Sequence, residues 1–253
     1  MAAEKIIETR SIRARFGAAV VLDDVNLSIY RHEIVVIIGE SGCGKTTLMR
    51  ILIGLAKPSS GTVFLEGAPP TRHAITKKVG VLFQNNALFG SMTVGENIAL
   101  PIAAYTDLDR SAIEKIIRMK LGMVGLAGFE NHLPSELSGG MKKKAAMARA
   151  LALSPSILFL DEPSSGLDPV SAAEIDELIL HINRSSGTTM VVVTHDLASV
   201  FTLTRRVIML GKAKKGIIAE GTPEFLKNEC NDPFVKQFFN RQPRPGTTGW
   251  QTV

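Results

Sequence analysis

Long apolar runs are missing from this sequence of 253 residues, although 45% of its residues are hydrophobic. The longest runs, Ile34 to Ile38 and Met190 to Val193, are strand-length. They fall far short of the roughly 18 to 20 residues that a membrane-spanning helix needs. Glu4 and Lys5 stand where a secretory signal would need an apolar run, so we expect no signal peptide.

Cysteine is also scarce, since Cys43 and Cys230 are the only two. This excludes a disulfide scaffold and is typical of a protein in a reducing cytosol. The net charge of +5 suits an anionic ligand, a nucleic acid or a membrane surface, and the charge alone does not choose among them. The length allows one sizeable core, or one domain with a lobe inserted into it.

Stretches of alternating or continuous apolar residues predict a mixed α/β fold. Residues 6–17 and 20–30 combine alternation with apolar pairs, which predicts antiparallel strands near the N-terminus. Residues 33–39 form a compact apolar strand that runs directly into a glycine-rich turn and a helix. Continuously apolar strands are typical of a parallel sheet that is buried on both faces. Further strands are expected at 61–67, 78–84, 156–163, 188–196 and 206–210.

The pattern changes between Gln84 and Ser154, where strand-like runs disappear and residues 111–126 show helical periodicity. This favours a mostly helical lobe inserted into an α/β core. Near the C-terminus, Phe234, Val235, Phe238 and Phe239 form a helical apolar stripe. We therefore predict a single domain over 1–240, with a core of 1–84 and 155–230, a helical subdomain of 85–154, and a C-terminal extension of 231–253 made of a short helix and a tail.

One segment has the form of a phosphate-binding loop. Gly39 to Thr46, GESGCGKT, fits the pattern G-x-x-x-x-G-K-[ST] at every fixed position, with a strand before it and a helix after it. Glycines let the backbone curl so that successive N–H groups and the helix N-terminus face an anion. Lys45 would reach the β- and γ-phosphates, and the Thr46 hydroxyl would bind Mg²⁺. The alternative is a chance glycine-rich turn.

Polar side chains follow three other predicted strands. Asp161 ends one strand and is expected to face the Mg²⁺ ion. Glu162 in the following turn would face a water molecule that attacks the bound phosphate. Gln84 and His195 follow two more strands, and would lie on the sheet edge where open α/β sheets bind ligands. Gln84 could contact Mg²⁺ or the water, and His195 the γ-phosphate. The alternative for each is an ordinary residue that forms local hydrogen bonds.

In six motifs, which occur in the expected order, the chain resembles the ATP-binding subunit of ABC transporters. Gly39 to Thr47 resembles the Walker A loop, and Gln84 the Q-loop. The remaining motifs are LSGGM at 137–141 (the signature), ILFLDEP at 157–163 (Walker B), SGLD at 165–168 (the D-loop) and the switch histidine His195. The resemblance implies an α/β P-loop NTPase (RecA-like) core with an N-terminal antiparallel β subdomain and an inserted α-helical subdomain.

The resemblance also implies a head-to-tail homodimer that sandwiches two ATP molecules with Mg²⁺. Each ATP would lie between the Walker A loop of one subunit and the signature helix of the other, and Phe16 would stack on adenine. The alternative for Phe16 is an ordinary core residue. Implied ATP-binding residues are Phe16, Gly39, Glu40, Ser41, Gly42, Cys43, Gly44, Lys45, Thr46 and Thr47. Implied catalytic residues are Glu162, His195, Gln84 and Lys45; those acting in trans are Ser138, Gly139, Gly140 and Asp168; metal ligands are Thr46, Gln84 and Asp161.

Several stretches are similar to the ATPases of Mla/Mce-type systems, which move phospholipid or related lipids between the membranes of diderm bacteria. Met141 is the sharpest sign, because most ABC ATPases have Gln after the glycines. The contribution of that Gln to nucleotide contact or helix capping must be absent here or supplied elsewhere. The other similar stretches are 82–101, 119–126, 134–141, 216–223 and 232–239.

This similarity implies an integral membrane permease of the Mla type as partner, and a place on the cytoplasmic face of the bacterial inner membrane. The segment 85–101 would line the groove that receives the permease, with Leu88, Phe89 and Met92 exposed; the alternative is a loop packed on its own lobe. A small accessory cytoplasmic subunit and a periplasmic Mce-domain protein are further candidate partners. Trp250 would either dock into a pocket or lie in a disordered tail.

The same residues are compatible with other functions. The chain could be the ATPase of an ABC importer for a small solute. It could also be a soluble ABC ATPase acting on nucleic acid or ribosomes, although such proteins usually carry two fused ATPase domains or long insertions, and we expect no nucleic-acid partner. A P-loop kinase or GTPase would have no use for Ser138 to Gly140 and His195.

Two features are less specific. Lysine clusters at 77–78, 142–144 and 212–215 are expected to be solvated surface, or alternatively contacts with the inner leaflet. In particular, we expect 142–144 to lie on a solvated helix face. Cys43 lies within the phosphate loop beside backbone amides that would favour a thiolate, so we expect it to be reactive.

Overall fold

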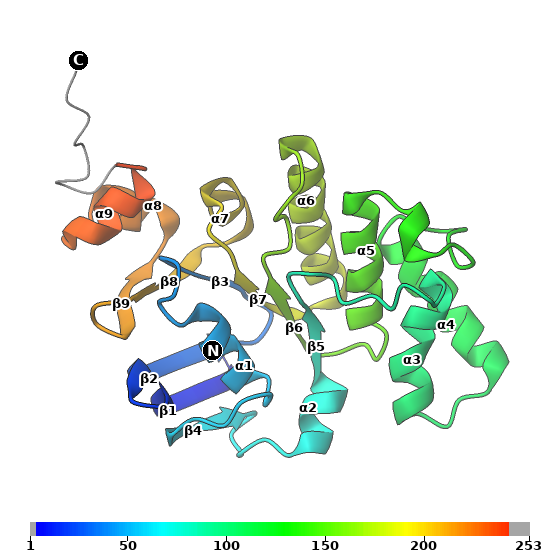
Figure 1. Cartoon of the computed structure of the whole chain (residues 1–253), viewed down its shortest axis with the longest axis horizontal. Helices are drawn as coiled ribbons and strands as arrows, with labels where there is room; N and C mark the ends of the chain where they lie inside the picture. The colour runs from blue at the N-terminus through cyan, green and yellow to red at the C-terminus, as the bar shows by residue number, and fades with distance from the viewer. Residues whose placement is uncertain (1–3, 243–253) are drawn as a thin grey trace.

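The computed structural model describes residues 4–242, which contain two sheets (Figure 1). The smaller sheet is antiparallel in the order β2-β1-β4, and the larger has the order β5-β6-β7-β3-β8-β9. In the larger sheet only the β8–β9 pair is antiparallel. The strands are β1 Lys5–Phe16, β2 Ala19–Tyr30, β3 Ile34–Gly39, β4 Ser60–Leu65, β5 Val79–Leu82, β6 Ile157–Asp161, β7 Thr189–Val193, β8 Arg206–Gly211 and β9 Gly216–Gly221.

The central strand β3 shows why its residues are continuously apolar. Side chains alternate along a strand, so Val35 and Ile37 face one hydrophobic cluster while Val36 and Ile38 face another. The first cluster lies between the two sheets, and the second lies under the helices on the other side. Because both faces are buried, no polar residue has a place in the strand, and the expected parallel sheet is confirmed.

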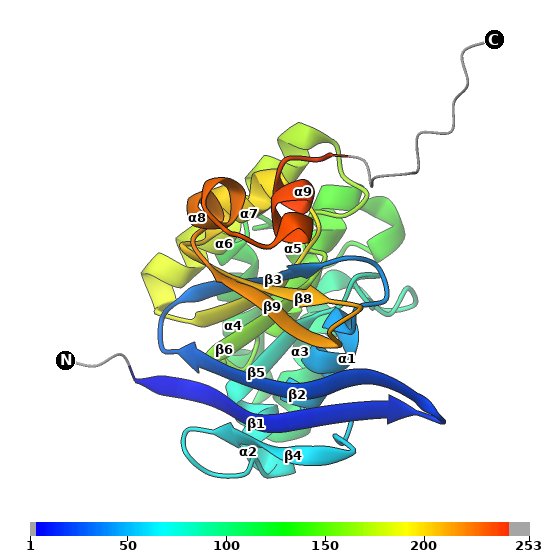
Figure 2. The same ribbon diagram turned by 90° about the vertical axis from the view of Figure 1, so that its left-hand side faces the viewer.

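Helices cover both faces of the larger sheet (Figure 2). Helix α1, Lys45–Leu52, packs between the sheets, and α6, Pro169–Ser186, and α7, Leu197–Leu203, pack on the opposite face. Asp168 begins α6 by accepting hydrogen bonds from two backbone N–H groups, and Gly187 ends it in the left-handed region. The remaining helices of this part are α2 Arg72–Lys78, α8 Pro223–Asn228 and α9 Pro233–Phe239.

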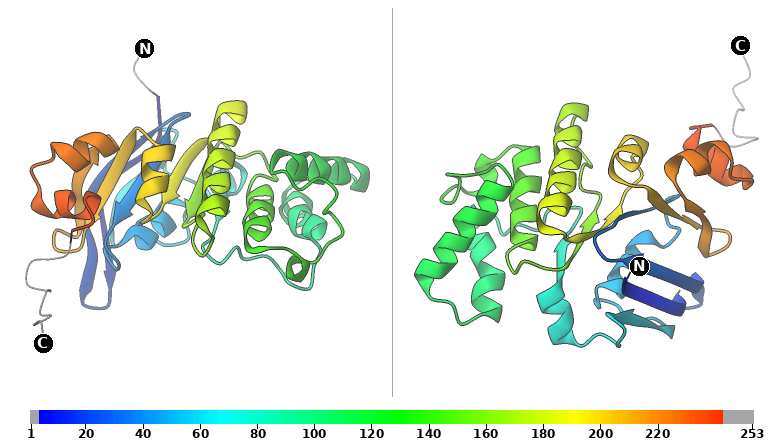
Figure 3. Two further views of the ribbon diagram at one scale, coloured as in Figure 1. Left: turned by 90° about the horizontal axis from the view of Figure 1, so that it is seen from above. Right: turned by 180° about the vertical axis from the view of Figure 1, so that it is seen from behind.

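A separate group of helices lies beside the sheet with its own hydrophobic cluster (Figures 1 and 3). It consists of α3, Val94–Tyr105, α4, Arg110–Met123, the 3₁₀ turn η1, Pro134–Glu136, and α5, Gly139–Ala150. Thr93 and Glu96 begin α3 with reciprocal side-chain hydrogen bonds to the backbone. Within residues 4–242, no helix combines the length and the apolar character needed to cross a membrane.

Two elements near the C-terminus compare differently with the expectations from the sequence. Strand β9 was not predicted, because its residues are only partly buried and it adds to the edge of the sheet through antiparallel pairing with β8. The expected C-terminal helix is present as α9, and it buries Val235 and Phe239 in the second cluster. The aromatic stripe of this segment therefore packs on the core. Trp250 lies outside the described residues.

Candidate active site

Four residues of the predicted site follow strands that end at one edge of the larger sheet. Strands β3, β5, β6 and β7 are mutually parallel, so their carboxyl ends point the same way. Gly39 ends β3, and Asp161 ends β6. Gln84 comes two residues after β5, and His195 two residues after β7. The topology therefore gathers on one edge residues that are far apart in the sequence.

The phosphate loop joins β3 to α1 through backbone geometry that only glycine accommodates. Gly39 has φ 148°, and a Cβ there would lie 2.3 Å from the carbonyl oxygen of Leu210. Gly44 has φ 102° and is the residue before α1, where no side chain caps the helix. The first N–H groups of α1 are therefore not occupied by a capping side chain, which suits an anion.

Lys45 folds back over this loop. Its Nζ atom donates hydrogen bonds to the carbonyl oxygens of Gly39, at 2.8 Å, and Glu40, at 3.0 Å. These contacts hold the ammonium group above the loop that the N–H groups line. Thr46 is exposed at the start of α1, and Thr47 is partly buried. The arrangement places a positive charge and a hydroxyl beside the loop, as phosphate binding requires.

Cys43 departs from the expectation of a reactive thiolate. The residue is only 1% exposed. Burial raises the pKa of its thiol, and the charge of Lys45 opposes this rise only in part. The expectation was wrong because the packed loop removes the thiol from water, which disfavours the charged form.

Asp161 is the buried carboxylate of the site, with 7% of its surface exposed. Burial raises its pKa, and repulsion from the neighbouring Glu162 raises it further. Positive charges oppose the rise; they belong to Lys45, Arg50 and Lys143. A buried carboxylate next to a second carboxylate is a site that a cation stabilises. The chemistry of the residues therefore fits Mg²⁺, which prefers one or two carboxylates with other oxygen ligands.

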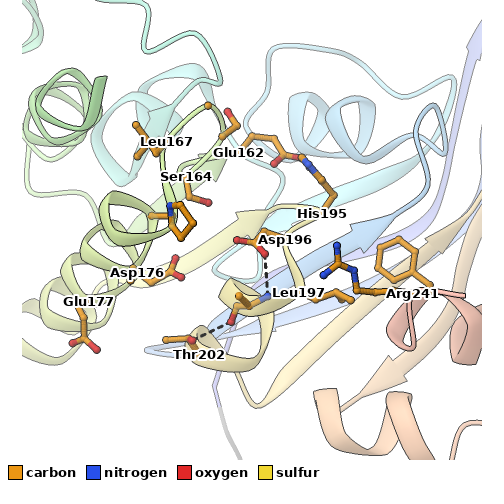
Figure 4. A pocket seen from close by; sticks show the side chains of 17 residues that line it. Glu162, Ser164, Leu167, Asp176, Glu177, His195, Asp196, Leu197, Thr202 and Arg241 are labelled. Carbon is orange, nitrogen blue, oxygen red and sulfur yellow. Dashed lines mark hydrogen bonds and ion pairs between the residues drawn. The ribbon is translucent and has the colours of Figure 1, made fainter. Parts of the chain in front are cut away.

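Glu162 and His195 are brought into direct contact (Figure 4). Nδ1 of His195 lies 2.8 Å from Oε1 of Glu162, and the Thr194 hydroxyl donates to the other carboxylate oxygen at 3.5 Å. Glu162 has a φ of 50°, in the left-handed region that is unfavourable for a residue with a side chain. The Glu162 side chain is 13% exposed and that of His195 is 70% exposed. The Glu162 carboxylate is thus fixed by His195 and Thr194 and remains partly accessible to solvent.

Glu162 and His195 also line a cavity of about 810 Å³ (Figure 4), whose lining includes no residue of the phosphate loop. It is lined by residues of the D-loop, by α6 and α7, and by Phe238 and Arg241 near the end of the described chain. Asp176 of α6 is 4% exposed, and its buried Oδ1 atom has no hydrogen-bond partner among the described residues. Burial raises the pKa of Asp176 to about 6.

The signature residues begin α5, in the helical group. Ser138 is exposed, and its hydroxyl accepts a hydrogen bond from the Met141 N–H at 3.3 Å. A Cβ on Gly139 would meet only Leu167, at 3.3 Å, and one on Gly140 only Ser171, at 3.9 Å. Among the described residues, none of these contacts reaches the phosphate loop. The packing of this chain therefore gives no strong reason for glycine at 140.

Three further residues can be placed. Phe16 ends β1 and is 63% exposed, so it is not a core residue. Asp168 is engaged as the cap of α6 and accepts hydrogen bonds from the Val170 and Ser171 N–H groups. Met141 packs partly buried against the hydrophobic cluster of the helical group. These positions do not bring Phe16 or Asp168 into contact with the Glu162–His195 pair, and their roles stay predictions.

The comparison with known families decides the identity of the fold. The family described as ABC transporter matches residues 22–165. The chain belongs to the ABC transporter ATPase family. The residues that match run from β2 to the D-loop, and so include the phosphate loop, the signature helix and Glu162.

Relatives of this ABC ATPase include proteins with two different names. The intermembrane phospholipid transport system ATP-binding protein MlaF of Haemophilus influenzae is 36% identical, over 93% of this chain and 99% of that protein. MlaF of Escherichia coli K12 is also 36% identical, over 93% and 88%. The probable ribonucleotide transport ATP-binding protein mkl of Mycobacterium tuberculosis is 39% identical over 92% of this chain. The chain spans 66% of the length of that mycobacterial protein.

Solved structures agree with the family. The structure of cbiO1 from Clostridium perfringens, part of the ABC transporter complex cbiONQ, has a TM-score of 0.80 at 29% identity, covering 89% of this chain and 92% of that chain. A dimeric ATP-binding cassette in a post-hydrolysis state bound to ADP and Pi has a TM-score of 0.76 at 32% identity, covering 85% and 98%. The expected P-loop NTPase fold is confirmed.

The ABC ATPase also contains site residues that the sequence did not indicate. The three lysines 142–144 were expected on a solvated helix face, and for Lys143 this is wrong, because it is 4% exposed and bonded to the backbone of Gln84 and Glu162. Lys144 instead forms an ion pair with Glu174 at 2.8 Å. A run of like charges offered no signal to single out its middle member.

The loop after Gln84 is shaped by another residue that was not predicted. Asn97 of α3 is fully buried, and its side chain bonds to the backbone N–H and carbonyl of Phe89 and to the carbonyls of Met92 and Thr93. Phe89 itself is 55% exposed, while Leu88 packs partly buried between two hydrophobic clusters. Of the three apolar residues expected to be exposed in this loop, Phe89 is the one that is clearly so.

Proposed function

We propose that this chain is the ATP-hydrolysing motor subunit of an ABC transporter that moves phospholipid or related lipid between the inner and outer membranes. It works at the cytoplasmic face of the bacterial inner membrane, as a homodimer around two ATP molecules, and drives an integral membrane permease. The observation that carries the hydrolytic part is the 2.8 Å contact between Glu162 and His195 on the strand edge that bears the phosphate loop.

In this proposal, the loop N–H groups and Lys45 hold the phosphates of ATP. The Glu162 carboxylate accepts a proton from the water that attacks the γ-phosphorus, and the bond to the β-phosphate oxygen breaks to yield ADP and phosphate. His195 holds Glu162 in place and contacts the γ-phosphate. Thr46, Gln84 and Asp161 would hold Mg²⁺, which neutralises charge on the phosphates.

The open surface at the start of α5 supports the sandwich dimer. Gly140 has room for a methyl group within its own chain, which leaves its lack of a side chain to be explained by another molecule. A phosphate of ATP held by the partner's loop would approach Ser138, Gly139 and Gly140 closely. The similar cassette solved with ADP and Pi is itself dimeric, which supports the same assembly here.

The test of this assembly is Ser138→Arg, compared with Ser135→Arg, another exposed serine three residues earlier. Ser138→Arg should leave ATP binding by the monomer intact and abolish ATPase activity, because the bulky cation blocks the partner's site. Ser135→Arg should retain activity. If Ser138→Arg instead abolished ATP binding by the monomer together with ATPase activity, the sandwich dimer would be contradicted.

The lipid substrate is supported by similarity to MlaF over nearly the whole of both chains. The exposed Phe89 of the loop after Gln84 supplies an apolar contact for the permease. Purification of the complex in detergent, followed by mass spectrometry, should recover a permease with bound phospholipid. Candidate further partners are a small accessory cytoplasmic subunit and a periplasmic Mce-domain protein, which the same purification would reveal.

A second candidate is the transport of a small solute, favoured by the ribonucleotide transport name of the mycobacterial relatives at 39% identity. Proteoliposomes containing the purified complex separate the two. Stimulation of ATP hydrolysis by phospholipid but not by ribonucleotides supports the lipid system. The opposite result would replace it with the solute importer.

A further inference from the structure

Lys143 is the buried cation of the signature helix. Its Nζ atom donates hydrogen bonds to the carbonyl oxygen of Gln84, at 2.8 Å, and to that of Glu162, at 3.2 Å. These two acceptors lie 59 and 19 residues away in the sequence. One ammonium group therefore joins three parts of the molecule: the helix α5, the turn after β5, and the turn after β6.

Arg149, six residues further along α5, holds the same turn after β5. Its guanidinium donates to the carbonyl oxygens of Ala87, at 2.6 Å, and Asn86, at 3.0 Å. Asn86 and Ala87 have φ angles of 60° and 53°, which are unfavourable for residues with a side chain. Contacts with the surrounding structure must therefore maintain this backbone geometry. With Lys143 on Gln84, α5 donates hydrogen bonds to three carbonyls of this turn, so the helix and the turn are joined at three points.

The second bond of Lys143 reaches the core. The Glu162 carbonyl accepts from Lys143 and also from the Ser165 N–H at 3.2 Å, while the Glu162 N–H donates to the Val193 carbonyl at 2.8 Å. These contacts hold both ends of a residue whose φ is in the left-handed region. A shift of α5 along this path would change the backbone of Glu162, and so the position of the carboxylate that faces His195.

We propose that Lys143 is a positioning residue that couples the two ATP sites of the dimer. This inference rests on the sandwich dimer proposed above, in which an ATP held by the partner contacts the start of α5 at Ser138. Binding of that ATP displaces α5, and Lys143 transmits the displacement to Gln84 and Glu162 of the same subunit. These two residues serve the second ATP, which is held by the phosphate loop of their own subunit. Occupation of one site thereby sets the geometry of the second.

The chemistry of the position supports a role beyond packing. Burying an ammonium group is unfavourable, and an apolar side chain of similar length would fill the same space without that penalty. Burial lowers the pKa of Lys143, and the charges of Glu162 and Asp161 oppose this fall. The cation is kept where it can donate to two carbonyls from different segments, which an apolar residue cannot do.

The test compares Lys143→Met with Lys144→Met in the purified full-length chain. Lys144 is the adjacent residue on α5 and bonds to Glu174 rather than to either turn, so its removal controls for loss of one charge. Lys143→Met should lower kcat by about 10- to 100-fold, as misplacement of a catalytic group does. The ATP concentration for half-maximal binding to the monomer should change by less than about twofold, since the phosphate loop is untouched.

The decisive measurement is the Hill coefficient for ATP-dependent hydrolysis. Two coupled sites allow a value above 1 and at most about 2, and Lys143→Met should bring it to about 1 while Lys144→Met retains the value of the unmodified chain. Lys143→Gln, which keeps a single shorter donor group, should show the same loss and serves if the Met variant does not fold. Lys143→Arg, which keeps several donors, should recover a coefficient above 1.

The outcomes separate this inference from the proposed function. If Glu162→Gln forms no dimer with ATP, the proposed sandwich dimer is contradicted, and the proposed coupling through Lys143 is contradicted with it. If that dimer forms, but folded Lys143→Met and Lys143→Gln keep the kcat and Hill coefficient of the unmodified chain, the inference alone is overturned. A loss of cooperativity in Lys144→Met equal to that in Lys143→Met would also overturn it, since charge rather than the two bonds would then be responsible.

Discussion

Nδ1 of His195 lies 2.8 Å from Oε1 of Glu162, across the ends of the neighbouring parallel strands β6 and β7. The pairing of the two strands makes this contact possible, because the Glu162 N–H donates to the carbonyl of Val193, the last residue of β7. A histidine two residues beyond that carbonyl then reaches the carboxylate. The contact between Glu162 and His195 is thus a direct extension of sheet hydrogen bonding.

The first prediction concerns the carboxylate of this pair. Glu162→Gln should bind ATP with unchanged affinity and lower turnover by about 10²- to 10⁴-fold, because the amide cannot accept the proton of the attacking water. The stalled enzyme should accumulate as an ATP-bound dimer, measured by size-exclusion chromatography. Glu224→Gln, at an exposed position of α8, is the control and should turn over normally. Normal turnover of Glu162→Gln would remove it as the base.

The second prediction separates stability from activity at Gly140. Gly140→Ala should leave the folded state intact or stabilise it by about 0.4 to 1 kcal/mol, because the site has room for a methyl group and alanine favours helix. Its ATPase rate should nevertheless fall by about tenfold or more, because the methyl group lies where the partner's phosphate would approach. Gly122→Ala on α4, where a Cβ meets nothing within 4 Å, is the matched control.

Thermal melting and ATPase assays on the two alanine variants provide the measurement. Gly122→Ala should match or exceed the stability of the unmodified chain and retain its activity. Full activity in Gly140→Ala would show that no molecule approaches this glycine closely, and would count against the sandwich geometry.

The third prediction is a pH dependence of stability from Asp176. Burial raises its pKa to about 6, and the charges of Asp196 and Glu177 add to this while Ser199 opposes it through a hydrogen bond. The folded state therefore binds a proton more readily than the unfolded state, whose carboxyl has its usual lower pKa. The stability that the protonated group confers is complete below the unfolded pKa, near 4, and is lost as pH rises through about 6.

Asp176→Asn removes this penalty. At pH 7 to 8 the variant should be more stable than the unmodified chain by about 1 to 2 kcal/mol, after the full shift is discounted for solvent screening. The advantage should shrink as pH falls from 6 to 4. Denaturant unfolding at several pH values measures it, with Glu224→Gln, at an exposed position of α8 whose charge is not among those that raise the pKa of Asp176, as control. A stability difference that does not vary with pH would contradict the assignment.

The sequence was sufficient for features that are local. The phosphate loop is a continuous motif whose glycines serve the backbone of that same segment, as the positive φ angles of Gly39, Gly42 and Gly44 show. The strand β3 could be recognised because burial on both faces leaves five consecutive apolar residues. The strand ends that carry Asp161 and His195 were found in the same way. Their meeting at one edge follows from the parallel topology.

The tertiary structure alone decided how identical neighbours differ. Lys142, Lys143 and Lys144 are equivalent in sequence, but successive residues of a helix point about 100° apart, so that one turns inward while the next faces Glu174. Which one is buried depends on how α5 packs against turns that are remote in the chain. Similarly, the amides around Cys43 suggested a thiolate, and only the packing of the loop showed that its sulfur is shielded from water. Burial is a property of the assembled fold, because the atoms that exclude water come from distant segments.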